Sequence, residues 1–266
     1  MLRAVLVALA FLATPAGAAP RRIVSINPCV DAILMHVADA GQIAAISHYS
    51  KLPRSSSITP AQAAQFTATS GTAEEVVARA PDLVIAGAHV DPATIAMLKR
   101  LNIDLLQLGV AETVAQSRAQ VASVATAVGH PARGVRLNGR IDAALAVARH
   151  GGPPVPALIW QGGGLVPGSG TLADELLRAT GFRNLSRDYG LSQWDVLPLE
   201  YLVARPPRLL LTVGDRSGTD RVLGHPVLAP LRKRIAVRQF PEKLLFCGGP
   251  TIIAATTHLA AARRSL

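Results

Sequence analysis

The chain has 266 residues, of which 50% are hydrophobic and 17% are charged, and its formal net charge is +10. These values exclude an intrinsically disordered protein, because disorder requires low hydrophobicity and many charges. The length suits one large domain or two smaller lobes, and the two cysteines exclude a disulfide-dense scaffold or a four-cysteine zinc site.

Residues 1–18 have the organisation of an export signal. Arg3 precedes an apolar run over residues 4–13, and the segment ends in Ala16-Gly17-Ala18. The run is shorter than the roughly 20 apolar residues that a membrane span needs. We therefore predict a cleaved signal peptide over 1–18 and a periplasmic mature protein. Loss of Arg3 lowers the formal charge from +10 to +9. Nucleic acid is not an expected partner, because the basic residues are scattered and lack interleaved aromatic residues.

Strands and helices alternate in the first half of the mature chain. Strands are expected at 23–26, 42–47, 82–86 and 103–108, and helices at 31–37, 72–81 and 92–101. The later strands are continuous apolar runs, which is typical of a parallel sheet covered on both faces.

The middle of the chain is helical and the alternation then resumes. Helical periodicity extends from 112 to 150 and is broken at Gly129-His130-Pro131, because proline is tolerated in a first turn and not inside a helix. Further strands are expected at 157–160, 209–213 and 234–240, with helices at 172–180, 199–204 and 251–264. The sequence thus predicts an α/β protein of two lobes joined by a helix, with a cleft suited to a small ligand.

A helix–strand unit occurs once in each lobe. Residues 74–85 read EEVVARAPDLVI, and residues 200–211 read EYLVARPPRLLL. In both, a glutamate opens a short helix, a proline follows seven residues later, and an apolar strand comes next. A local interaction with the helix dipole explains why a glutamate stands at the start of each helix. It does not explain the shared Val-Ala-Arg-x-Pro run.

Three motifs together resemble the iron-complex and vitamin B12 class of periplasmic substrate-binding proteins, which serve ABC importers. They are RIVSINP at 22–28, the unit at 74–85, and Trp194 followed by LPLE at 197–200. The resemblance covers the mature chain and implies two Rossmann-like lobes with parallel sheets joined by a long backbone helix. It divides the chain into a signal peptide (1–18), an N-terminal lobe (19–131), a connecting helix (132–150) and a C-terminal lobe (151–266).

The same resemblance implies a role for the two repeated acids. Glu74 and Glu200 hold the positions at which these proteins dock onto arginines of the permease dimer. Two exposed carboxylates far apart on a rigid body fix the orientation of such a complex through charge-assisted pairs. The alternative is a purely local role at each helix N-terminus.

Ligands of parallel sheets bind beyond the carboxyl ends of the strands. Residues that follow the expected strands are therefore the candidate ligand-binding residues: Asn27, His48, Tyr49, His89, Trp160, Trp194, Arg216 and Phe246. The resemblance implies that Trp194 faces the ligand. For each aromatic the alternative is core packing. His48 or Tyr49 suits a haem iron, and Arg216 suits a carboxylate or an anionic chelate, although solvated surface roles are the alternative.

The expected cargo is a metal chelate. We rank a ferric siderophore first, a corrinoid second and haem third, since only 4% of the residues are aromatic. No catalytic residue, resident metal or cofactor is expected, because the chain has no GxSxG or HExxH motif and its glycine-rich run at 162–170 matches no phosphate-binding loop. An enzyme or a non-transporting sensor on the same scaffold is the alternative, and the mature protein is expected to be a monomer.

Cys29 and Cys247 each follow an expected strand, one in each lobe. Export favours their oxidation. A bridge between them would close a loop of more than 200 residues, and it requires Cα atoms within about 7 Å. A disulfide and two separate thiols beside the cleft both remain open at this point.

Overall fold

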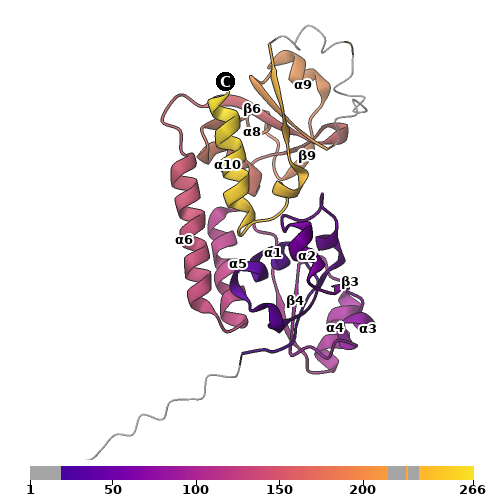
Figure 1. The fold of residues 1–266 in the computed structure, drawn as a ribbon. Coiled ribbons are helices and arrows are strands. Elements are labelled where there is room, and N and C mark those ends of the chain that lie inside the picture. The colour runs from indigo at the N-terminus through magenta and orange to yellow at the C-terminus, as the bar shows by residue number, and fades with distance from the viewer. Residues whose placement is uncertain (1–18, 215–225, 227–233) are drawn as a thin grey trace, which may run out of the picture.

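A computed structural model describes residues 19–214, 226 and 234–266, and it has two α/β lobes stacked end to end (Figure 1). The predicted signal peptide and Arg216 lie outside the described residues. The N-terminal lobe has a parallel five-stranded sheet of order β3-β2-β1-β4-β5. Its strands are β1 (Ile23–Ser25), β2 (Ile43–Ser47), β3 (Ala68–Thr69), β4 (Leu83–Ala86) and β5 (Asp104–Gln107).

Side-chain caps fix where the helices of this lobe begin. Asn27 accepts hydrogen bonds from the backbone N–H groups of Cys29 and Val30, which starts α1 one residue later, at Pro28. Thr72 and Asp91 cap the helices α3 and α4 in the same way. The helices are α1 (Pro28–Val37), α2 (Pro60–Ala64), α3 (Ala73–Val77) and α4 (Pro92–Arg100), with 3₁₀ turns η1 (Ala40–Gln42) and η2 (His48–Lys51).

Two helices follow β5, as the sequence predicts. Helix α5 (Val114–Ala127) ends before His130, and α6 (Pro131–Ala148) starts at the proline. The two helices pack closely, since a Cβ on Gly134 would lie 2.6 Å from the Ala125 methyl. Helix α6 runs along one side of the molecule towards the second lobe, beside α5 and then α10 (Figure 1).

The C-terminal lobe has a parallel four-stranded sheet of order β11-β10-β6-β8. A separate antiparallel pair joins β7 to β9. The strands are β6 (Val155–Trp160), β7 (Leu165–Pro167), β8 (Phe182–Asn184), β9 (Trp194–Val196), β10 (Leu209–Val213) and β11 (Ala236–Phe240). The helices are α7 (Leu172–Ala179), α8 (Leu185–Asp188), α9 (Leu199–Ala204) and α10 (Thr251–Arg264), with 3₁₀ turns η3 (Gly162–Gly164) and η5 (Glu242–Leu244).

This architecture confirms the predicted α/β class with parallel sheets. The antiparallel pair β7–β9 and the short strands β3 and β8 were not predicted from the sequence. In the described part of the chain, no helix is both long and apolar enough to cross a membrane.

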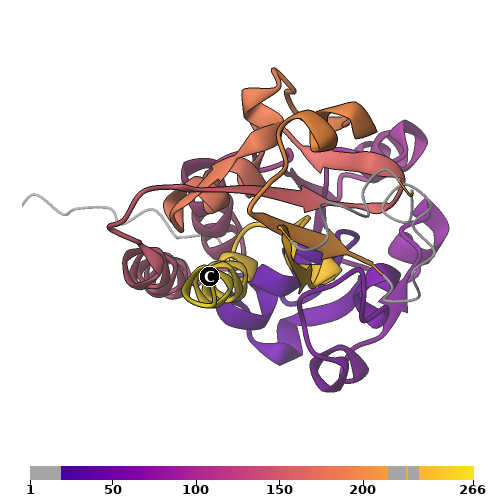
Figure 2. The same cartoon turned by 90° about the horizontal axis from the view of Figure 1, so that it is seen from above.

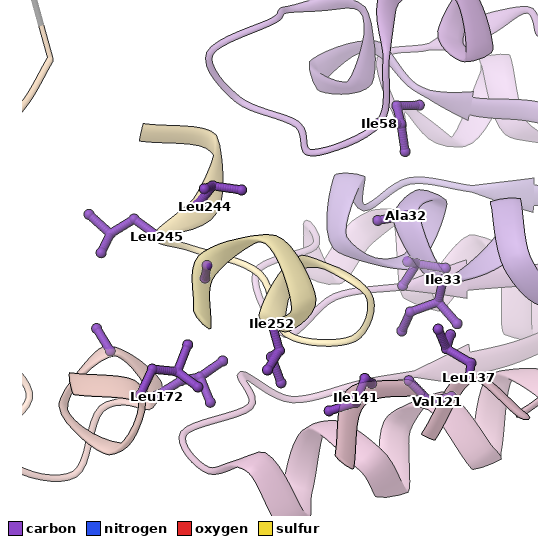
Figure 3. Close-up of a cluster of buried hydrophobic side chains, with 14 of the residues drawn as sticks. Ala32, Ile33, Ile58, Val121, Leu137, Ile141, Leu172, Leu244, Leu245 and Ile252 are labelled. Carbon is purple, nitrogen blue, oxygen red and sulfur yellow. The ribbon is translucent and has the colours of Figure 1, made fainter. Parts of the chain in front are cut away.

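One apolar core joins the two lobes. Its buried members come from the sheets of both lobes and from α1, α5, α6, α7 and α10. Figure 3 shows Ile252 of α10 beside Ile141, with Leu172 of the second lobe on one side and Ile33 of the first on the other. Viewed from above, α6 and α10 lie side by side at one edge of the molecule (Figure 2). The lobes are therefore held together along the edge that these helices form.

Candidate functional site

The carboxyl ends of the first sheet face the second lobe. The contacts that cross between the lobes here include the disulfide Cys29–Cys247, a hydrogen bond of 2.7 Å between the hydroxyls of Ser57 and Thr251, and an ion pair of 3.1 Å between Arg54 and Glu242. Side chains that follow β1, β2 and β4 therefore lie at the boundary of the two lobes, where the sequence predicts the ligand.

Tyr49 and His48 are carried into this boundary by the turn η2, directly after β2. Tyr49 is 50% exposed, and its hydroxyl has no hydrogen-bond partner among the described residues. The His48 ring lies against it, with centroids 4.0 Å apart. His48 Nδ1 is 3.2 Å from the carbonyl oxygen of Thr69. This hydrogen bond fixes the orientation of the imidazole ring and occupies Nδ1, so that Nε2 points away from Thr69.

A buried carboxylate anchors this turn. Asp31 Oδ2 accepts hydrogen bonds from the Ser47 backbone N–H (2.9 Å) and from the Ser50 hydroxyl (2.6 Å). Burial raises the pKa of Asp31 to about 7, against the opposing effect of the serine donors. The carboxylate thus ties α1 to both sides of the turn that carries Tyr49, and no motif in the sequence indicated it.

Two other predicted residues of the first lobe have different surroundings. Asn27 caps α1, so its carboxamide oxygen already accepts two backbone hydrogen bonds. His89 is exposed after β4 and, together with Asn27 and Phe246, lines a pocket of about 80 Å³ between the lobes.

The second lobe contributes two aromatic rings. Trp194 in β9 is 37% exposed and Phe246 is 50% exposed, and their ring centroids are 6.2 Å apart. Trp194 is presented by the antiparallel pair β7–β9, and the residue before it, Gln193, has a positive φ of 53°. Trp194 and Phe246 are thus exposed aromatic rings close to each other, and Tyr49 is an exposed ring on the turn that follows β2, at the carboxyl end of the first sheet.

The expectation for Trp160 is corrected by the structure. Its side chain is 1% exposed and packs in the core with Leu158, Val166 and Leu197. Because β6 is a central strand and β7 covers its end, the indole has no open face for a ligand. The glycine-rich run after it forms the turn η3 and then enters β7.

Cys29 and Cys247 form a disulfide, with Cα atoms 5.1 Å apart. The bond joins the first turn of α1 in one lobe to the loop before α10 in the other. Of the two alternatives left open by the sequence, the structure has the bridge.

Glu74 and Glu200 occupy equivalent places in the two lobes. Each is the second residue of a short helix, α3 or α9, and each is exposed. Neither carboxylate has an ion pair or hydrogen bond within the described residues. By contrast, the neighbouring Glu75 accepts hydrogen bonds from the Ser70 N–H and the Thr69 hydroxyl, which lower its pKa. The two helices lie at opposite ends of the molecule, both away from α6 (Figures 1 and 2).

A larger pocket, of about 670 Å³, lies between the loop at Arg54 and the elements β11, η5 and α10. Its charged lining includes Arg54, Arg238, Lys243 and Glu242. This pocket differs from the aromatic boundary in having three cationic side chains, those of Arg54, Arg238 and Lys243, on its wall. In the described residues, no three His, Cys, Asp or Glu side chains gather in a metal-binding arrangement.

The comparison with protein families decides the classification. Residues 23–233 match the family described as periplasmic binding protein, which is more than half of the chain. The chain belongs to this family. No curated protein matches the chain by sequence.

Solved structures of periplasmic binding proteins have the same fold. The haem-binding protein RhuT from Roseiflexus sp. RS-1 is 24% identical with a TM-score of 0.76, over 91% of this chain and 97% of that chain. A haem-binding protein from Pseudomonas aeruginosa is 22% identical with a TM-score of 0.71, over 91% and 92%. The vitamin B12-binding protein BtuF of Vibrio cholerae is 16% identical with a TM-score of 0.70, over 92% and 97%.

Proposed function

We propose that this periplasmic binding protein captures a metal chelate between its lobes and delivers it to an ABC importer, and that the chelate is haem. The observation that carries the proposal is the set of exposed aromatic side chains, Tyr49, Trp194 and Phe246, at the lobe boundary. A flat, largely apolar macrocycle is the kind of ligand that aromatic faces bind well.

The low aromatic content of the chain favours a siderophore over haem. The placement of the aromatic residues reverses this ranking. The chain has two tryptophans, three tyrosines and five phenylalanines, and one of each type is exposed in this region. Burying these three rings against a macrocycle contributes favourably on the order of 25 cal/mol per Å² of apolar surface removed from water.

Tyr49 and His48 supply the chemistry for the iron. Tyrosine and histidine are both established axial ligands of haem iron. Tyr49 is half-exposed, and its hydroxyl is unpartnered among the described residues. His48 has Nδ1 against the Thr69 carbonyl, and histidine ligands of metals usually make such a hydrogen bond through the ring nitrogen that does not bind the metal. We propose Tyr49 as the iron ligand, with His48 beside it.

The ligands of the similar structures support haem as the proposed cargo. Two of the proteins named above bind haem and one binds vitamin B12. A ferric siderophore remains the second candidate, and the observation in its favour is the pocket that Arg54, Arg238 and Lys243 line. Those cations suit the carboxylates or catecholates of an anionic chelate.

Glu74 and Glu200 are proposed as the docking residues for the permease. Their exposure and lack of partners in the described chain leave both carboxylates available for arginines of another protein. Because they lie at the two ends of the molecule, forming both pairs at once restricts the orientation of the complex.

Absorbance titration of the mature protein tests the cargo. Ferric haem, a ferric catecholate, a ferric hydroxamate and cobalamin are each added, and quenching of tryptophan emission is followed in parallel. We expect saturable haem binding with a Kd below about 10 μM, which corresponds to roughly −7 kcal/mol. Binding of a siderophore but not of haem would establish the second candidate, and binding of none would refute the chelate proposal.

Two variants test the iron ligand. Tyr49→Phe keeps the ring and removes the hydroxyl, so the haem absorption spectrum should change and the Kd should rise by about tenfold or more. Tyr201→Phe is the matched control, since Tyr201 is an exposed tyrosine on α9, and it should behave as the wild type. An unchanged spectrum in Tyr49→Phe and a changed one in His48→Ala would assign the iron to His48.

A further inference from the structure

The loop that carries Phe246 belongs to the second lobe but is fastened to the first. We call residues 246–251 the crossing segment. Cys247 is bonded to Cys29 at the start of α1. The Gly249 N–H donates to the Ser117 hydroxyl of α5 at 2.6 Å, and the Thr251 hydroxyl pairs with Ser57 at 2.7 Å. All three contacts are made to the first lobe.

The fit of this segment leaves no room for side chains at its centre. A Cβ on Gly248 would collide with the Ser117 side chain, and a Cβ on Gly249 would lie 2.9 Å from Ile33. Gly249 also has a positive φ of 58°, which glycine adopts at little cost. The backbone therefore lies directly on α1 and α5, and Cys247 is 4% exposed.

Phe246 lies at the edge of this fastened segment, and its ring lies near an aromatic ring of its own lobe. Its backbone is held through Cys247 to α1, whereas its ring is 6.2 Å from Trp194 of the second lobe's β9. Phe246 also lines the pocket that Asn27, Cys29 and His89 share. The distance between the two rings therefore depends on how firmly the crossing segment is held to the first lobe.

We propose that the Cys29–Cys247 disulfide is a positioning element of the ligand site: it holds the Phe246 ring against Trp194 and thereby sets the affinity for the bound chelate. The hydrogen bonds from Gly249 and Thr251 hold the later part of the segment, and the disulfide is the contact adjacent to Phe246. Because two rings fixed before binding lose little freedom when a ligand arrives, the pre-set pair strengthens binding. The affinity part of this inference rests on the proposed function, whereas the ring placement does not.

Tryptophan emission tests the placement without any ligand. Trp160 is 1% exposed, so a soluble quencher such as iodide reports mainly on Trp194. The variant Cys29→Ala/Cys247→Ala and the variant Phe246→Ala should both increase the iodide quenching constant, by about twofold, because each uncovers the indole. Ser57→Ala removes a different contact of the same segment and should leave quenching within the error of the wild type.

Haem titration of the same variants tests the consequence. The cysteine change and the Phe246→Ala change should each raise the Kd for haem by about five- to twentyfold. The variant that combines all three substitutions should have a Kd no more than about twofold above that of the weaker binder of the two, because both changes disturb the same Phe246–Trp194 pair. Multiplied effects in the triple variant would show that the disulfide acts through something other than Phe246. Unchanged quenching in the cysteine variant would overturn the proposal outright.

The test still gives an answer if the cysteine variant does not fold or if the wild-type protein does not bind haem. If the cysteine variant does not fold, native wild-type protein is reduced with dithiothreitol, the freed thiols are counted, and the same quenching and titration are repeated. If wild-type protein does not bind haem, the proposed cargo fails, and the quenching comparison alone still confirms or overturns the positioning role.

Discussion

At the scale of single residues, Asp31 is a carboxyl group in an unusual place. It is fully buried, and its hydrogen bonds reach the backbone and the side chain of the turn that presents Tyr49. Burial raises its pKa from 3.8 to about 7. The folded protein therefore retains a proton on this group over a range in which the unfolded chain has released it.

The pH dependence of stability follows from that shift. Because the folded pKa lies above the unfolded one, the contribution of this group is most favourable below about pH 4 and is lost as the pH rises towards 7. The loss is on the order of 2–4 kcal/mol for a shift of this size. Asp31→Asn stays neutral, so its stability relative to wild type should increase steadily between pH 4.5 and 7.5.

Chemical denaturation at several pH values measures this difference. Asp104→Asn is the control, because Asp104 is exposed on β5 and its replacement should show no such trend. A constant difference between Asp31→Asn and wild type across the range would mean that the carboxyl titrates normally in the folded protein.

The residues of the site were predictable to different degrees. Tyr49, Trp194 and Phe246 could be singled out because they follow or begin strands near the carboxyl edge of a sheet. The same rule selected Trp160, which is buried, since a position at a strand end does not reveal what covers it. The bonding of Asp31 to Ser47 and Ser50 depends on how α1 lies against β2, and the spacing of these residues carries no signal for it.

At the scale of elements, the same helix–strand unit stands at corresponding places in the two lobes. Helix α3 leads into β4, and α9 leads into β10, with the glutamate at the same position of each helix. Both strands are interior strands of their sheets. The repetition therefore places one unpartnered carboxylate at each end of the described molecule, which is what a two-point attachment requires.

Removing both carboxylates should separate binding from transport. We expect Glu74→Ala/Glu200→Ala to retain the wild-type Kd for the cargo, because neither carboxylate has a hydrogen bond or ion pair to another described side chain, Tyr49 and Trp194 included. Its unfolding free energy should change by less than about 1 kcal/mol, the usual size of a helix-dipole effect. Stimulation of the importer's ATPase in vesicles should be lost.

The single variants and Asp104→Ala complete this comparison. Each single change should reduce stimulation partly, whereas Asp104→Ala, which removes an exposed carboxylate elsewhere, should leave it intact. A double variant that still stimulates transport, or that no longer binds its cargo, would remove the docking assignment.

The lengths of the helices and strands explain why part of the fold could be predicted from the sequence. The predicted helices at 199–204 and 251–264 and the strand at 209–213 agree with α9, α10 and β10, because each is an apolar pattern of sufficient length with clear ends. The missed strands β3, β7, β8 and β9 have two or three residues. Such strands contain too little periodicity, and their pairing depends on tertiary contacts.

At the scale of the whole molecule, the disulfide closes a very large part of the chain. Its cysteines are 218 residues apart in sequence. The chain-entropy estimate for a loop of this length is about 5 kcal/mol, as an upper value. Reduction or the double alanine variant should therefore lower Tm by up to about 10–20 °C, measured by circular dichroism with and without dithiothreitol. A Tm independent of reductant would mean that the bond does not form in solution.

The continuous core and the crossing segment together determine how the protein responds to its cargo. Buried side chains of α1, α5, α6 and α10 connect both sheets, and the disulfide and the bonds of Ser117 and Ser57 close the same boundary. A hinge needs a few loop residues that absorb large changes in backbone angles. Here the connections between the lobes are a packed helix and a covalently fastened segment, so the cleft has little freedom to close.

Spin labels at Lys99→Cys and Arg205→Cys measure this directly, since both positions are exposed and lie in different lobes. We expect the mean label distance to change by less than about 2 Å when the cargo binds, the range of pre-organised complexes. In the Cys29→Ala/Cys247→Ala background the distribution should broaden, because the covalent contact is gone while the helical core remains. A shift of several ångströms in the wild-type background would show that the lobes close on the ligand and that the core acts as a hinge.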